Sequence, residues 1–94
     1  IILFLCANGA AVNNAPVPPP SCPAGSGTVT GTLTSANLIL RPQNTPAINS
    51  FADAITQILN GNTYTNVHTD DGVAPQNTGP GDFPSGEIRG QNVQ

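Results

Sequence analysis

Several segments of the chain carry the apolar patterns of β-strands. Residues 1–5, IILFL, are continuously apolar. Residues 28–34, TVTGTLT, alternate, so that Val29 and Leu33 share one face and threonines occupy the other. A short apolar run covers residues 38–40, residues 63–69 are rich in β-branched side chains, and residues 86–93 form the last candidate strand. We therefore expect a mainly β fold.

One short helix is predicted between these strands. Ser50 is suited to cap its N-terminus, and the carboxylate of Asp53 suits the positive end of the helix dipole. Gly61 is placed to end the helix. The apolar side chains at helical spacing are Phe51, Ile55, Ile58 and Leu59. We interpret this stripe as core packing.

The segments between these elements are rich in turn residues. The chain has ten prolines and ten glycines, and long loops are expected around APVPPP and across DDGVAPQNTGPGDFPSG. Charged residues make up only 7% of the chain, lysine is absent, and the net charge is −3. A basic surface for nucleic acid is therefore not expected. The apolar run 1–5 is too short for a membrane span, which needs about 20 residues.

Cys6 and Cys22 are the only cysteines, and they flank a loop without apolar periodicity. A disulfide between them is the natural interpretation, and it would contribute about 3 kcal/mol to stability. Two free buried thiols are the alternative. A disulfide indicates an oxidising compartment, so we expect a secreted or cell-surface protein.

Polar residues gather on the last two candidate strands. In YTNVHT, Asn66 and His68 project to one face, and in GEIRGQ, Glu87 and Arg89 share a face. If the two strands pair across the loop, these four side chains meet on one surface. We expect a structural cluster in which Glu87 and Arg89 pair and His68 lies between them.

Metal binding and catalysis receive little support from the sequence. The acids Asp70, Asp71 and Asp82 lie among glycines and asparagines and are weak calcium candidates, because their spacing matches no EF-hand loop. Solvated turn residues are the alternative. A single histidine cannot build a zinc site alone, and no hydroxyl lies in a nucleophile-elbow motif. We expect no catalytic residues and no cofactor.

Two motifs carry a resemblance to a known family. NGNTYTNVHT, followed later by PSGEIRGQ, is similar to the C-terminal part of the CHRD domain, the module named from chordin. The segments FLCAN and GTVTGTLTSANL extend the similarity over most of the chain. The residues 70–83, DDGVAPQNTGPGDF, are an insertion relative to the family pattern.

The resemblance implies a small extracellular domain without a catalytic role. Its fold would be an immunoglobulin-like antiparallel β-sandwich, with residues 1–94 forming a single CHRD-like domain. A whole domain of this family begins with further strands upstream of FLC, so we expect the N-terminal strands of the domain to be lacking. Similarity to the module does not carry over the partners of chordin.

A β domain that lacks strands has unpaired sheet edges that can bind another chain. Our leading hypothesis is a secreted structural subunit that assembles with identical copies by strand addition. The assembly strand would consist of Ile1, Ile2, Leu3, Phe4 and Leu5. A monomeric binding module for a secreted protein ligand, or for a glycan, is the alternative, and a metal-dependent enzyme is a weaker one.

Overall fold

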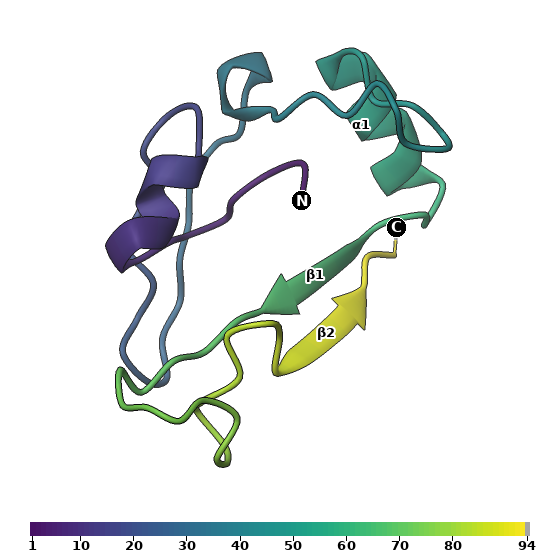
Figure 1. The fold of residues 1–94 in the computed structure, drawn as a ribbon. Coiled ribbons are helices and arrows are strands. Elements are labelled where there is room, and N and C mark those ends of the chain that lie inside the picture. The colour runs from purple at the N-terminus through teal and green to yellow at the C-terminus, as the bar shows by residue number, and fades with distance from the viewer. Residues whose placement is uncertain (94) are drawn as a thin grey trace. The chain divides into compact units, whose positions relative to one another are not determined.

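The computed structural model describes residues 1–93, which belong to two compact units, Ile1–Ala54 and Ile55–Gln94. Two 3-10 helices, η1 (Gly9–Asn14) and η2 (Ser35–Asn37), lie in the first unit. The helix α1 (Phe51–Leu59) follows, and the strands β1 (Tyr64–Val67) and β2 (Ile88–Gln91) lie in the second unit (Figure 1). Within residues 1–93 no helix has the length and apolar character needed to cross a lipid bilayer.

The predicted disulfide is confirmed. Cys6 and Cys22 are joined with their Cα atoms 5.0 Å apart. The side chain of Asn8 fastens the same loop, because its amide donates to the Cys22 carbonyl and its oxygen accepts from the Cys22 amide, both at 3.0 Å. The Ala7 amide also donates to the Pro20 carbonyl at 3.0 Å. The loop therefore closes through one covalent bond and three hydrogen bonds.

A small core lies in the first unit. Leu38, Ile48 and Ala54 are buried together, and Ile2, Leu3 and Phe51 pack against them. A backbone bridge between Arg41 and Ile48 holds the segment after Leu38 in place. The core is small for the length of the unit, and many large apolar side chains along residues 1–93 stay exposed.

The helix α1 begins and ends as the sequence predicts. The Ser50 hydroxyl accepts a hydrogen bond from the Asp53 amide at 3.1 Å, and the Asp53 carboxylate accepts from the Asn49 amide at 2.9 Å. Gly61 has a φ of 73°, its amide donates to Ile58, and the Asn62 amide donates to Gln57. This pair of bonds is a Schellman motif, for which glycine is favoured because the backbone is left-handed.

The apolar stripe of α1 is only partly core. Ala54 is fully buried and Phe51 packs on the core. Ile55 and Leu59 are exposed, so the prediction that the whole stripe packs inside is wrong for these two residues. They lie on the second half of the helix, beyond the residues that contact the core of the first unit.

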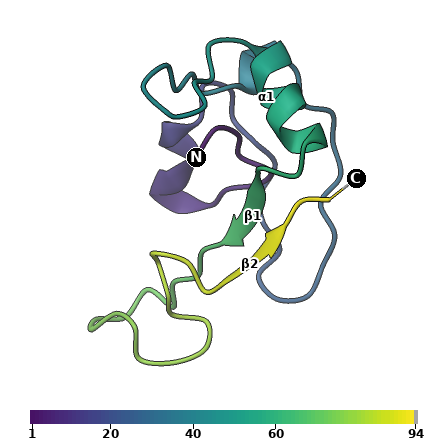
Figure 2. The ribbon, with the colours of Figure 1, turned by 90° about the vertical axis from the view of Figure 1, so that its right-hand side faces the viewer.

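The second unit contains an antiparallel pair of strands. β1 and β2 run side by side in opposite directions, and the chain between them forms a long irregular loop beyond one end of the pair (Figures 1 and 2). In the part of the chain that the structure describes, these two strands form the whole sheet. The expected adjacency of the last two strands is confirmed.

The other expected strands are not formed. Residues 1–5, 28–34 and 38–40 carry no strand assignment, so the described residues contain a two-stranded antiparallel sheet and one helix, and the expected sandwich is not confirmed. A strand needs a hydrogen-bonded neighbour. Residues 28–34 offer only Val29 and Leu33 for burial, and both remain half-exposed. The alternation was present, but too little apolar surface accompanies it to hold a sheet.

Candidate functional site

The candidate site comprises the β1–β2 pair and the loop that joins the two strands. The register places Tyr64 opposite Gln91, Asn66 opposite Arg89 and Val67 opposite Ile88. Directly opposed residues in an antiparallel pair share a face. Asn66 and Arg89 therefore lie on the same surface, as the sequence predicts.

His68 lies just beyond β1 and binds two neighbours. Its Nδ1 is 2.7 Å from the Pro84 carbonyl oxygen, and its Nε2 is 3.3 Å from the side-chain nitrogen of Asn66, Nδ2. A carbonyl oxygen can only accept, so Nδ1 carries the proton and Nε2 accepts from Asn66. His68 thus ties the end of β1 to the loop that enters β2, and its partners are Pro84 and Asn66 instead of the expected Glu87 and Arg89.

Glu87 and Arg89 have separate partners. The Glu87 carboxylate accepts hydrogen bonds from the Thr69 hydroxyl and from the Gly81 amide. The Arg89 guanidinium lies over the Tyr64 ring, 4.8 Å from its centre, which is a cation–π geometry. Within residues 1–93 the expected Glu87–Arg89 ion pair is not formed, because Glu87 is occupied by loop donors and Arg89 by an aromatic face.

Gly86 marks a close approach between the loop and β1. Its φ is 126°, a conformation that side chains rarely adopt, and a Cβ at this position would lie 2.8 Å from the carboxamide of Asn66. The Gly86 amide donates to the Phe83 carbonyl at 3.0 Å and closes a turn. Glycine at this position lets the chain turn into β2 beside Asn66.

The three loop acids that the sequence singles out come together. Asp70, Asp71 and Asp82 each offer a carboxylate oxygen, and these three atoms all lie within 4.8 Å of one another. Asp70 also accepts from the Gly72 amide at 2.7 Å, and Asp71 accepts from the Val73 amide at 2.8 Å. Asp70 and Asp71 are exposed, whereas Asp82 is only 2% exposed.

Asp82 is held by Thr78, a residue that the sequence analysis did not identify. One oxygen of Asp82, Oδ2, accepts from the Thr78 amide at 3.0 Å and from the Thr78 hydroxyl at 2.8 Å. These bonds, led by the backbone one, lower the pKa of Asp82 despite its burial, and the neighbouring Asp71 acts in the same direction. The other oxygen, Oδ1, is buried and has no hydrogen-bond partner within residues 1–93. Asp82 is therefore a buried carboxylate with one oxygen held by Thr78 and the other without a hydrogen-bond partner among the described residues.

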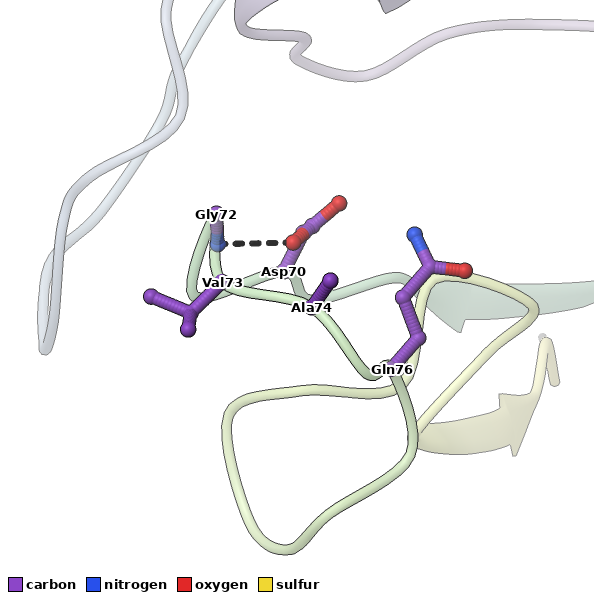
Figure 3. A pocket seen from close by; sticks show the side chains of 5 residues that line it. All are labelled: Asp70, Gly72, Val73, Ala74 and Gln76. Carbon is purple, nitrogen blue, oxygen red and sulfur yellow. Dashed lines mark hydrogen bonds between the residues drawn. The ribbon is translucent and has the colours of Figure 1, made fainter.

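A shallow hollow adjoins the acid cluster. It is lined by Asp70, Gly72, Val73, Ala74 and Gln76 (Figure 3). In this view the Asp70 carboxylate and the Gln76 amide point to the same side of the loop, while Val73 points away from them. Asp70 thus belongs both to the acid cluster and to the lining of this hollow.

The β1–β2 pair is unusually open for a sheet. All four residues of β2 are exposed, and so are three of the four residues of β1. The opposed Val67 and Ile88 are 44% and 66% exposed, so one face of the pair presents apolar side chains. Two strands alone are marginally stable in water, and a third strand or a covering layer is normally needed.

The register of the β1–β2 pair determines which backbone groups point outwards from its two edges. The Asn92 amide donates to the Thr63 carbonyl at 2.9 Å, so the inward-pointing groups on β1 belong to Thr63, Thr65 and Val67. The backbone groups of Tyr64 and Asn66 on β1, and of Arg89 and Gln91 on β2, consequently point outwards. These are the groups that an added strand would bind.

The predicted assembly strand, Ile1–Leu5, lies in the first unit. Ile2 and Leu3 pack on the core of the same chain, the Ile2 carbonyl accepts from the Ile39 amide at 2.9 Å, and the Ile1 carbonyl accepts from the Arg41 side chain at 2.9 Å. Ile1 and Leu5 are exposed. The segment therefore has contacts within its own chain but no strand pairing.

Comparison with known proteins gives no match: no family model, no characterised protein and no solved structure is similar to this chain at a significant level. The resemblance to the CHRD domain therefore stays a prediction that depends on the motifs at Tyr64–Thr69 and Pro84–Gln91.

Proposed function

We propose that this chain is a secreted, non-catalytic structural subunit, which assembles by adding a strand from a second copy to the β1–β2 pair. The main support for this proposal is the open sheet, which has exposed strands, an apolar Val67–Ile88 pair on one face and outward-pointing backbone groups on both edges. A third strand would satisfy those backbone groups and cover part of the apolar face. The Cys6–Cys22 disulfide supports secretion.

The β1 edge is the better acceptor of the two. Residues 64–67 of β1 carry no charge, whereas β2 contains Arg89. Charged residues on an edge strand disfavour pairing with further strands. The incoming strand would then bind the outward-pointing groups of Tyr64 and Asn66.

Ile1–Leu5 is the proposed donor. It is a continuous apolar run, and its end residues Ile1 and Leu5 are 66% and 50% exposed. Its backbone accepts hydrogen bonds from the Ile39 amide and the Arg41 side chain, but it pairs with no strand of its own chain within residues 1–93, so its transfer to a second copy would break no sheet. A donor at one place and an acceptor at another make a head-to-tail contact, which produces open chains when it does not close into a ring.

The test uses proline to block one edge at a time. Asn66→Pro removes an outward-pointing amide of β1, and Arg89→Pro removes the corresponding amide of β2 as the matched control. Neither amide is used between β1 and β2 in this register. Analytical ultracentrifugation and negative-stain microscopy of the oxidised full chain then measure assembly, and circular dichroism verifies that each variant folds.

We expect the native chain to form oligomers or filaments, Asn66→Pro to stay at the 9.5 kDa monomer, and Arg89→Pro to assemble as the native chain does. A double variant, Ile1→Asn with Leu5→Asn, tests the donor, because both residues are exposed and the packed Ile2 and Leu3 remain. It should also stay monomeric. A native chain that sediments as a monomer at high concentration would refute the proposal.

A monomeric binding module for a secreted protein is the second candidate. It is favoured by the cation–π pair of Arg89 and Tyr64, since Tyr64 is 53% exposed and both residue types are enriched at protein interfaces. The sedimentation experiment separates the two candidates. If the native chain is monomeric, Arg89→Ala becomes the variant to test for loss of ligand binding.

A further inference from the structure

The acid cluster of the second unit contains more negative charge than its surroundings neutralise. Asp70, Asp71 and Asp82 bring carboxylate oxygens within 4.8 Å of one another. The unit has one basic residue that is always charged, Arg89, and its guanidinium lies over the Tyr64 ring. Three charged carboxylates at this spacing repel one another, and either a proton on one of them or a cation among them relieves the repulsion.

A second observation concerns the buried member of the cluster. Asp82 is 2% exposed, its Oδ2 is bound by Thr78, and its Oδ1 has no hydrogen-bond partner although it is buried. A buried carboxylate oxygen without a partner loses the hydration that it has in water and gains nothing in return. Such atoms call for an explanation, and a bound ion is one that fits a carboxylate grouped with two others.

The loop around Asp82 is built to hold this carboxylate in one place. The Asn77 amide donates to the Asp82 carbonyl at 2.9 Å, and the Asp82 amide donates to the Gly79 carbonyl at 3.1 Å. Together with the two bonds from Thr78, they fasten both the backbone and the side chain of Asp82. Its free oxygen is therefore positioned in advance of any ligand.

We propose that Asp70, Asp71 and the free oxygen of Asp82 bind one calcium ion. The donor set consists only of oxygen atoms, which excludes a preference for zinc or copper and is typical of calcium and magnesium. Calcium fits better, because it accepts irregular geometry and several carboxylates, whereas magnesium requires a nearly ideal octahedron. The ion would connect the start of the loop, directly after β1, with its far part before β2.

The site does not depend on strand addition. A chain that stays monomeric and binds calcium would support this inference and refute the proposed assembly. A chain that assembles equally well with calcium and with a chelator, and shows no calcium binding, would support the proposed assembly and refute the calcium site.

Isothermal titration calorimetry of the oxidised full chain with calcium chloride, at fixed ionic strength, tests the site. We expect one ion per chain with a dissociation constant of about 10⁻⁴ to 10⁻³ M, the range of extracellular calcium modules. Asp82→Asn keeps the size of the side chain and an oxygen for Thr78, but it removes the charge. It should weaken binding at least about tenfold, since it deletes one of three ligand charges.

Asp53→Asn is the matched control, because it removes the same charge from the α1 N-terminus, outside the cluster. It should leave the affinity within about twofold, as expected for loss of a solvent-screened charge that is not a ligand. Asp70→Asn is a second test variant, since Asp70 is exposed and its substitution threatens folding less than a change at the buried Asp82.

The inference is overturned if the native chain releases no heat with calcium up to millimolar concentrations. It is also overturned if Asp70→Asn and Asp53→Asn weaken binding equally, because the ion would then belong to the diffuse charge of the surface. Equal affinity for magnesium chloride under the same conditions would overturn the assignment to calcium.

Discussion

Replacement of Gly86 by alanine tests the geometry of the loop most directly. Gly86 has a φ of 126°, and an added Cβ would lie 2.8 Å from both the oxygen and the nitrogen of the Asn66 carboxamide. Two costs therefore arise in the Gly86→Ala variant. The backbone must keep a conformation that only glycine adopts readily, and the Asn66 side chain must move.

The backbone cost decides the magnitude. A residue with a side chain in such a sparsely populated region costs about 1–3 kcal/mol. The steric cost is smaller, because Asn66 is exposed and its carboxamide lies at the end of a rotatable side chain. We expect a loss of about 2 kcal/mol, which corresponds to a decrease in Tm of about 8–16 °C for a domain of this size.

The assay is thermal unfolding followed by circular dichroism, with urea unfolding as a second measure. Gly90→Ala is the matched control, since Gly90 lies in β2, has no atom within 4 Å of its ideal Cβ position and does not have the unusual φ of Gly86. It should be neutral or slightly stabilising. The double variant Gly86→Ala with Asn66→Ala should recover the steric part of the loss only.

The reasoning is refuted if Gly86→Ala and Gly90→Ala have the same Tm. If the double variant recovers full stability, the close contact with Asn66 is the main cost, and the assignment of most of the loss to the backbone is wrong.

Two further predictions concern the disulfide and the buried acid. The double variant Cys6→Ser with Cys22→Ser should destabilise the first unit by about 3 kcal/mol, the value expected for a loop of this size. Urea unfolding without reductant measures this loss. A double variant as stable as the native chain would show that the Asn8 hydrogen bonds hold the loop alone. The hydrogen bonds from Thr78 lower the pKa of Asp82 in the folded chain. The charged Asp82 carboxylate therefore adds to the free energy of unfolding above the ordinary pKa of about 3.9, and this stabilisation is lost as the pH falls through the lowered pKa. In a calcium-free buffer, the native chain should therefore lose stability below about pH 4 more steeply than Asp82→Asn, and parallel curves would contradict this assignment.

Local signals in the sequence predict the parts of the fold that depend on neighbouring residues. Ser50, Asp53 and Gly61 specify both ends of α1, because capping and a left-handed terminus are local chemistry. The disulfide is predictable for a similar reason, since Cys6 and Cys22 have no other partner. Two polar motifs predict the pairing of β1 with β2, and the register confirms it.

The parts that depend on distant contacts could not be predicted in this way. Alternation in residues 28–34 indicates a strand only if another strand is available to pair with it, and none of the described segments does so. The partners of His68 and Glu87 lie in the loop, at Pro84, Thr69 and Gly81. Spacing along two strands places these side chains on a face but does not say which loop atoms compete for them.

Burial distinguishes Asp82 from the other two acids of the candidate site. Turn-rich sequence predicts solvated acids, and for Asp70 and Asp71 exposure is what the structure shows. The one available signal was Thr78, four residues before Asp82, which can bind a carboxylate through both its amide and its hydroxyl. A threonine at this distance from an aspartate within a glycine-rich loop is therefore worth weighing as a sign of a fixed carboxylate.

The ring closed by Cys6 and Cys22 affects how cleavage of this chain would be detected. The 3-10 helix η1 lies inside that ring and has no buried residues, so it is accessible. A protease that cuts there leaves both pieces covalently joined, and the nicked protein migrates as one species until reductant separates them. Electrophoresis with and without reductant consequently distinguishes an intact ring from a cut one.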